Sequence, residues 1–354
     1  MKVLMIGLGG IGQRHLRNLK TLLPRDLEVI AYRVRNSSAV ISSTLTIEEG
    51  LSLEEKYDIR SYADLQEALG EKPDVAFITN PSSLHLPVAL EAARAGCHLF
   101  IEKPLSDSLA GVEELIDTVE KNRRVACVGY QLRFHPYLNW IRELLREEAI
   151  GRLLAVRLDV GESLPAWHTY EDYRQMYAAR RELGGGVILS QIHEIDYAYF
   201  LFGMPRRLFA LGGKLSRLDI DVEDTASILM ECQWKGELLP IHLQQDFLQK
   251  PPSRHCEIVG DGGKILWDYH AATLTIWRSN EDKPEIRRLE TFERNQLFLD
   301  ELKHFLACLR GEEKPKVSLR DGANSLKMAL AAKQSLETGE VVSIYENEIC
   351  QRDV

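Results

Sequence analysis

Six residues near the N-terminus have the spacing of a dinucleotide-binding loop. Gly7-Leu8-Gly9-Gly10-Ile11-Gly12 directly follows the apolar run Val3-Leu4-Met5-Ile6. The first glycine permits a tight turn after a strand, the second lets the backbone approach a pyrophosphate, and the third lets the next helix pack closely. That helix, expected near Ile11 and clearest over residues 15–23, would present free N–H groups to phosphates. The alternative is an ordinary glycine turn without a cofactor.

The residues after the second expected strand bear on which dinucleotide binds. An acid about twenty residues past the glycines would bind the ribose diol of NAD and repel a 2′-phosphate. The segment 31–38 contains no acid, but it contains Arg33 and Arg35, followed by serines. Arginine can grip a phosphate or stack on adenine. We therefore favour NADP(H); the alternative is that Arg33 only covers the adenine and NAD(H) is used.

Three further motifs follow in order along the chain: Thr79-Asn80-Pro81-Ser82-Ser83-Leu84-His85, Glu102-Lys103-Pro104, and a glycine-rich run from Gly184 to Asp196 that contains His193. Together with the glycine loop they resemble the Gfo/Idh/MocA (glucose–fructose oxidoreductase, inositol dehydrogenase, MocA) family over nearly the whole chain. The stretch from Val222 to Gly263 is also similar to the C-terminal sheet domain of that family.

The resemblance implies a fold, an activity and a set of site residues. The family consists mainly of NAD(P)-dependent dehydrogenases and reductases that act on sugars, cyclitols and related compounds. It implies that Lys103 and His193 are the catalytic pair and that the Lys103–Pro104 peptide is cis. It also implies a homodimer or homotetramer formed through the C-terminal sheet. The resemblance and the loop together suggest these cofactor contacts: Gly7, Gly9, Gly10, Ile11, Gly12, Arg33, Arg35, Thr79, Asn80, Pro81, His85, Glu102 and Lys103.

The chemistry of Lys103 and His193 suits alcohol oxidation. The reaction needs a base for the hydroxyl proton and a hydride acceptor, which the cofactor supplies. Imidazole titrates near neutral pH, so His193 can accept that proton. An ammonium beside the reacting oxygen would stabilise developing alkoxide or polarise a ketone, and Lys103 follows a strand whose carboxyl end is a usual ligand site. The alternatives are a surface lysine and a helix histidine bonded to a backbone carbonyl.

Helical spacing predicts that Leu189, His193 and Asp196 share one helix face, with Ser190 adjacent to His193. Asp196 could orient His193 or be structural. Many members of the family carry an aspartate three or four residues before the histidine, where this chain has Ser190 and Leu189. Ser190 can hydrogen-bond a sugar hydroxyl, but it cannot serve as a carboxylate.

Other side chains are expected near the site, each with a structural alternative. His85 would contact the cofactor or be a packed histidine. Arg133 would reach substrate or form a structural ion pair. Trp167 belongs to the loop 162–179, which would cover the pocket or be an ordinary interface loop. The full set of expected substrate contacts is Lys103, Tyr130, Arg133, Trp167, Ser190 and His193.

The elements that must position these residues follow two patterns. In the first third of the chain, short apolar runs alternate with amphipathic stretches, which predicts a parallel, doubly wound sheet. Residues 36–58 are polar and form an insertion. After Gly151, seven strand-like runs with short links and the turn Asp261-Gly262-Gly263 predict a mostly antiparallel sheet. Two helices follow, over 294–309 and 320–338, with Gly339 as a C-cap.

The fold class is therefore an α/β Rossmann domain plus an α+β domain with a large, mostly antiparallel open sheet. We place the dinucleotide-binding domain at residues 1–130 and the substrate and oligomerisation domain at 131–345, with its last helix able to pack back on the first domain. Residues 346–354 would form a polar tail.

Bulk properties exclude several classes of protein. The net charge of −9 argues against nucleic-acid binding. The six cysteines are scattered, without the spacing of a zinc site or disulfide framework, so we expect no metal. No apolar run is long enough to span a membrane, and Met1-Lys2 leads straight into a strand, which leaves no room for a signal peptide. We expect a cytoplasmic protein.

The sequence thus predicts an NAD(P)-dependent oxidoreductase that transfers hydride between nicotinamide and a hydroxyl or keto carbon of a sugar. The segments 190–197 and 245–247 resemble members associated with amino-sugar or surface-glycan biosynthesis. Two alternatives stay open: a non-catalytic dinucleotide-binding regulatory protein, and a sugar lyase or hydrolase that recycles its cofactor.

Overall fold

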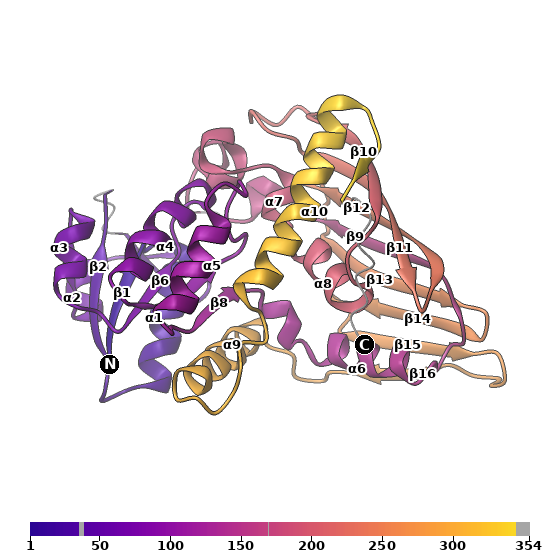
Figure 1. Cartoon of the computed structure of the whole chain (residues 1–354), viewed down its shortest axis with the longest axis horizontal. Coiled ribbons are helices and arrows are strands. Elements are labelled where there is room, and N and C mark those ends of the chain that lie inside the picture. Colours follow the sequence, from indigo (N-terminus) through magenta and orange to yellow (C-terminus); the bar gives the residue numbers. More distant parts are fainter. Residues whose placement is uncertain (35–38, 169, 345–354) are drawn as a thin grey trace.

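A six-stranded parallel sheet, in the order β5-β2-β1-β6-β7-β8, organises the first part of the chain (Figure 1). This computed structural model describes residues 1–34, 39–168 and 170–344. Helices cover both faces of the sheet, which explains why its strands are continuous apolar runs rather than alternating ones. The strands are β1 (Lys2–Ile6), β2 (Glu28–Tyr32), β5 (Arg60–Tyr62), β6 (Val75–Ile78), β7 (His98–Glu102) and β8 (Ala126–Gly129).

The first helix begins earlier than its clearest sequence signal. It starts at Gly10, inside the glycine loop, because Gly9 adopts an extended N-cap conformation and Gly12 permits close packing on the strand. The insertion folds into a two-stranded hairpin and a one-turn helix, which the sequence did not predict. The elements are α1 (Gly10–Leu22), β3 (Val40–Ile41), β4 (Ile47–Glu48), α2 (Leu53–Tyr57), α3 (Leu65–Gly70), α4 (His85–Arg94) and α5 (Val112–Lys121).

The second part of the chain forms a nine-stranded sheet in the order β16-β15-β14-β13-β9-β12-β11-β10-β17. Its neighbouring strands are antiparallel except for β9 and β12, which run parallel. Alternating burial along β13 confirms that only one face lies against the core. The strands are β9 (Leu153–Gly161), β10 (Arg207–Gly213), β11 (Thr225–Trp234), β12 (Glu237–Asp246), β13 (Ser253–Gly260), β14 (Gly263–Asp268), β15 (Thr273–Arg278), β16 (Glu285–Arg288) and β17 (Val342–Ser343).

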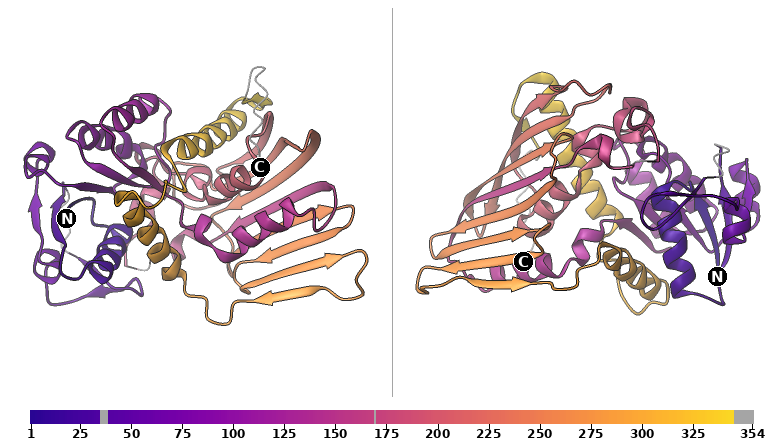
Figure 2. Two further views of the ribbon diagram at one scale, coloured as in Figure 1. Left: turned by 60° about the horizontal axis from the view of Figure 1, so that its bottom comes forward. Right: turned by 180° about the vertical axis from the view of Figure 1, so that it is seen from behind.

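Helices lie on the side of this sheet that faces the parallel sheet (Figure 2). They are α6 (Pro136–Arg146), α7 (Val187–Ser190), α8 (His193–Phe202) and α10 (Leu319–Thr338), whereas α9 (Arg294–Leu309) lies beside α1 of the first domain. Helix α10 contacts β10 and also β8 of the first sheet, and it ends at Gly339 in the left-handed conformation, as predicted. Helix α9 packs against α1, and its Leu302 and Phe305 join the core of the parallel sheet. The predicted polar tail at 346–354 lies outside the described residues.

Helix α6 begins at a buried histidine. His135 is 1% exposed, and its Nδ1 accepts a hydrogen bond from the Tyr137 N–H at 3.1 Å. The ring packs against Trp267 and Phe292, with centroids 4.8 and 4.9 Å apart. Burial, with a smaller contribution from the charge of Arg254, lowers the pKa of His135 to about 3. The folded protein therefore holds this ring neutral across the ordinary pH range.

This burial predicts a loss of stability in acid. Below pH 6.5 the unfolded chain protonates His135 while the folded protein does not, so the free energy of unfolding should fall as pH decreases, by at most about 1.4 kcal/mol per pH unit from this residue. His135→Asn, which keeps an N-cap acceptor, should flatten that dependence. Urea unfolding of both proteins at pH 7, 6 and 5 measures the two slopes. Equal slopes would contradict the assignment.

Candidate active site

The glycine loop has the geometry expected of a pyrophosphate site. A Cβ on Gly7 would lie 2.8 Å from Asn80 N, and one on Gly12 would lie 2.4 Å from Gly7 O, so neither position accepts a side chain. Gly7 also has a φ of +94°. At Gly9, by contrast, no described heavy atom lies within 4 Å of an added Cβ. The first and third glycines serve packing, and the second leaves its backbone open to a ligand at the N-terminus of α1.

The loop after β6 lies beside the glycine loop and is held by His85. Thr79 Oγ1 donates to Gly7 O at 2.6 Å. The two ring nitrogens of His85 lie 2.8 Å from Pro104 O and 2.8 Å from Asn80 O, and the residue is 1% exposed. This geometry favours the packed-histidine alternative, in which His85 joins the Asn80 loop to the loop that carries Lys103. The Lys103–Pro104 peptide is cis, as the resemblance implied.

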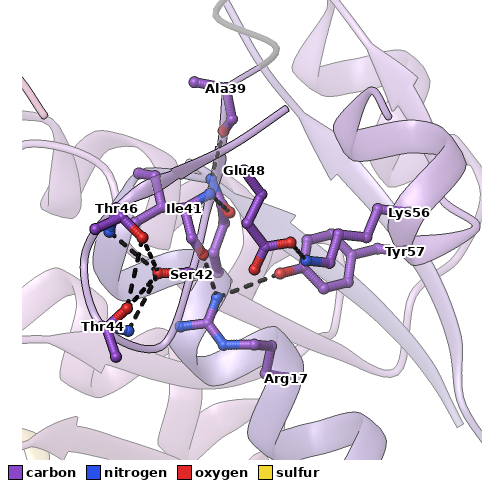
Figure 3. Close-up of polar contacts among 10 residues, drawn as sticks. Arg17, Ala39, Ile41, Ser42, Thr44, Thr46, Glu48, Lys56 and Tyr57 are labelled. Carbon is purple, nitrogen blue, oxygen red and sulfur yellow. Dashed lines mark hydrogen bonds and ion pairs between the residues drawn. The ribbon is translucent and has the colours of Figure 1, made fainter. Parts of the chain in front are cut away.

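An acid that the sequence did not suggest lies at the end of β2. Helix α1 holds the insertion: Arg17 Nη1 donates to Ile41 O at 2.7 Å and to Tyr57 Oη at 3.2 Å (Figure 3). The anchored helix α2 brings the Glu54 carboxylate into an ion pair with Arg33. No local signal could have shown this contact, because the two residues are 21 positions apart. Arg35 lies outside the described residues.

Lys103 directly follows β7, and its side chain contacts the second domain. Its Nζ donates to Ser190 O at 2.7 Å. Its own N–H donates to Glu102 Oε2 at 3.2 Å, while Glu102 Oε1 lies 2.6 Å from His15 Nε2. Glu102 and His15 are both buried. The lysine is thus held at its backbone by the first domain and at its ammonium by the second.

The helix predicted to carry Leu189, His193 and Asp196 on one face is interrupted. Helix α7 ends at Ser190 and α8 begins at His193, so the single-face arrangement was wrong. At the break, the carbonyl of Ser190 accepts a hydrogen bond from Lys103 Nζ, so this end of α7 has a partner outside the helix. The next carbonyl, Gln191 O, accepts from Gln245 Nε2 at 2.7 Å.

This break turns the His193 ring toward the end of β8. His193 is 6% exposed, and its Nε2 lies 3.2 Å from the side-chain nitrogen of Gln131. Burial lowers the pKa of His193 well below its usual value, and the positive charge of Lys103 lowers it further. The imidazole is therefore neutral at neutral pH and able to accept a proton.

Two expected substrate contacts lie behind His193. Tyr130 is fully buried, and its ring packs edge-on against His193 with centroids 5.9 Å apart. Arg133 is 2% exposed and holds Asp196 through two bonds, Nε to Oδ2 at 2.8 Å and Nη2 to Oδ1 at 2.7 Å. Ser325 Oγ also donates to Asp196 at 2.8 Å. These contacts favour the structural ion pair for Arg133 and the structural role for Asp196.

Several buried polar atoms at this place have no partner among the described residues. They are Asn80 Oδ1, Ser190 Oγ and His193 Nδ1, and Trp167 Nε1 in the loop 162–179. Buried polar atoms are normally hydrogen-bonded, so these atoms and the open Gly9 fit a site that is completed by a ligand. Trp167 itself packs edge-on against Phe247, with centroids 5.3 Å apart.

Among residues 1–34, 39–168 and 170–344, no cluster of three or more His, Cys, Asp or Glu side chains could hold a metal ion. Within the same ranges, no helix is long and apolar enough to cross a lipid bilayer.

Comparison with known families decides the assignment. The model of the Gfo/Idh/MocA oxidoreductase family with an NAD-binding Rossmann fold matches residues 1–130, and that of the Gfo/Idh/MocA C-terminal domain matches residues 138–266. The chain belongs to the Gfo/Idh/MocA oxidoreductase family. The first matched range contains the glycine loop.

Named relatives span the same length. The chain is 28% identical to myo-inositol 2-dehydrogenase of Thermotoga maritima, over 98% of this chain and 99% of that protein. It is 25% identical to 1,5-anhydro-D-fructose reductase of Ensifer adhaerens, over 91% and 96%. Among solved structures, levoglucosan dehydrogenase in complex with NADH and levoglucosan has the same fold, with a TM-score of 0.80 at 18% identity over 98% and 100%.

The buried ion pair of this family member predicts a large stability effect. Asp196→Ala removes both hydrogen bonds that Asp196 accepts from the buried Arg133 guanidinium and leaves it only the more distant Asp321 carboxylate at 3.8 Å, which should lower the free energy of unfolding by about 3 kcal/mol. The exposed Asp117→Ala should change it by less than about 0.5 kcal/mol. Urea unfolding at pH 7 measures both. The double variant Arg133→Met/Asp196→Leu should recover much of the loss; a loss as large as in Asp196→Ala would show that the pair itself is not the cause.

Proposed function

We propose that the protein oxidises a secondary alcohol of a sugar or cyclitol, or reduces the corresponding ketone, with Lys103 and His193 as the catalytic pair. The observation that carries the proposal is the Lys103 Nζ to Ser190 O contact of 2.7 Å, which brings an ammonium from one domain beside a neutral, buried imidazole of the other. The bound dinucleotide supplies the hydride acceptor or donor.

Each residue has a distinct task in the oxidation direction. His193 accepts the proton of the substrate hydroxyl, since its lowered pKa keeps the imidazole free of a proton at neutral pH. Lys103 stabilises the negative charge that develops on the same oxygen. In the reverse direction, Lys103 polarises the ketone and a protonated His193 returns the proton.

The proposed substrate class rests on the polar atoms around this pair and on the relatives. Ser190 Oγ and His193 Nδ1 are buried without partners among the described residues, and hydroxyl groups of a sugar ring could satisfy both. Relatives of the chain include enzymes named for inositols and for an anhydro sugar. The amino-sugar subclass suggested by the sequence stays a prediction. Tyr130 would line the site next to the His193 ring, and Trp167 would line it from the loop 162–179.

The choice of dinucleotide depends on Glu54. The sequence favoured NADP(H) because of Arg33, but the Arg33 guanidinium is paired with the Glu54 carboxylate, which also accepts from Ser61 Oγ at 2.6 Å. A 2′-phosphate would have to bind beside that negative charge, whereas a ribose diol can donate to it. We therefore propose NAD(H) as the preferred dinucleotide.

The homodimer or homotetramer expected from the sequence also stays a prediction. The outer face of the nine-stranded sheet carries exposed Leu211 and Leu229 on the neighbouring strands β10 and β11. Exposed apolar side chains on one sheet face are the kind of surface that a second copy would cover.

Variants of the pair test the catalytic proposal. Lys103→Met and His193→Asn should each lower kcat by about 10²–10⁴-fold, while Lys121→Met, an exposed lysine on α5, should leave it unchanged. For the wild type, kcat/KM for oxidation should stay level from pH 8 down to 6.5 and fall only at lower pH, because the pKa of His193 is lowered. Steady-state assays on a panel of sugars and cyclitols measure this. A kcat of Lys103→Met equal to that of the wild type would overturn the assignment of Lys103 and His193 as the catalytic pair.

The same assays separate the alternatives. Product formation without net change in nicotinamide absorbance would indicate the lyase or hydrolase that recycles its cofactor. Dinucleotide binding without turnover of any panel member, in wild type and variants alike, would indicate the regulatory protein.

A substitution at Glu54 tests the cofactor proposal. The wild type should bind NADH more tightly than NADPH, and Glu54→Gln should improve NADPH binding by about ten-fold, since it removes a negative charge beside the position of the 2′-phosphate. Quenching of protein fluorescence gives both dissociation constants. The nearby exposed Glu49→Gln is the matched control. Tighter NADPH binding by the wild type would instead restore the preference expected from the sequence.

A further inference from the structure

The loop 162–179 brings a tyrosine from the second domain to the glycine loop of the first. A Cβ added to Gly10 would lie 2.7 Å from Tyr170 Oη, so the tyrosine hydroxyl lies directly over the first residue of α1. Gly9, the adjacent residue, has nothing above it among the described residues. Tyr170 therefore borders the open position where a pyrophosphate would lie.

The loop itself holds this side chain in place. The Tyr170 ring stacks on His168, with centroids 5.1 Å apart and an interplanar angle of 16°. His168 Nδ1 lies 2.6 Å from Glu171 Oε1. Trp167, one residue earlier than His168, packs against Phe247 of the second domain. The position of the hydroxyl thus follows from the second domain and not from the glycine loop that it covers.

The hydroxyl is a hydrogen-bond donor at physiological pH. Burial raises the pKa of Tyr170, and the negative charge of Glu171 raises it further, so the O–H keeps its proton. The Glu171 carboxylate interacts with this hydroxyl. A phosphate oxygen bound at the N-terminus of α1 would be a second anionic acceptor close to this hydroxyl.

We propose that Tyr170 is a cofactor-positioning residue that donates its O–H to the pyrophosphate of the bound dinucleotide. The proposal rests on the dinucleotide binding that belongs to the proposed function. It assigns to this loop a contact with the cofactor in addition to the substrate contact expected of Trp167. The backbone N–H groups of α1 and the hydroxyl of Tyr170 would then hold the pyrophosphate from opposite sides.

Binding measurements with Tyr170→Phe test the proposal without any turnover. The variant keeps the ring and its stacking on His168 but lacks the donor. Calorimetric titration should give a dissociation constant for NADH about ten-fold or more weaker than that of the wild type, which is the size expected for one hydrogen bond to a charged group. ADP-ribose contains the pyrophosphate but no nicotinamide. Its dissociation constant should rise by the same factor in the variant.

Tyr173→Phe is the matched control, since this tyrosine lies in the same loop and its Oη accepts from the Asp219 N–H at 3.3 Å. It should bind both ligands as the wild type does. Melting temperatures without ligand check that all three proteins are folded. Dissociation constants of Tyr170→Phe within two-fold of the wild type, or tighter ones, would overturn the proposal. A wild type that binds neither NADH nor NADPH would overturn the proposed function together with it.

Discussion

The hydrogen bond from the Lys103 ammonium to the Ser190 carbonyl is the interaction on which the rest of the site depends. It joins the end of β7 to the end of α7 across the two domains, at 2.7 Å. The contact lies at the place where α7 stops and α8 starts again at His193. The cation, the helix break and the imidazole therefore meet at one point.

The charges of the site follow from the same contact. Burying an ammonium is costly unless it is paired, and Glu102, the residue before Lys103, supplies a nearby negative charge. Burial alone would raise the pKa of Glu102, but the hydrogen bond from His15 and the positive charge of Lys103 lower it overall, so the carboxyl stays ionised. The same cation that Glu102 balances lowers the pKa of His193. Burial is the main cause of the lowered pKa of His193, and the charge of Lys103 is the second.

The features that the sequence predicted depend on residues close along the chain, whereas the features that it missed depend on residues far apart in the sequence. The strands, the glycine loop and the end of α10 at Gly339 depend on periodicity and on residues close along the chain, and these predictions were confirmed. The contact at the break after Ser190 comes from a lysine 87 positions away, and the charge at the end of β2 comes from Glu54, 21 positions from Arg33. Helical spacing therefore predicted one helix that continues through Gln191. The segment 31–38 showed no acidic residue near Arg33.

The glycine run before α7 explains how the two domains approach closely enough for these contacts. A Cβ on Gly184, whose φ is +76°, would lie 2.9 Å from Ser83 N of the first domain, and Ser83 Oγ donates to Glu182 O at 2.9 Å. The contacts between the domains along the carboxyl edge of the parallel sheet include Tyr170 at Gly10, Glu182 and Gly184 at Ser83, and Ser190 at Lys103. A ligand that binds along this edge meets groups that are already held in position, so little ordering of the protein opposes its binding. The close approach that the glycines permit is thus the condition for a preorganised site, and a side chain at Gly184 would disturb it without touching any reacting atom.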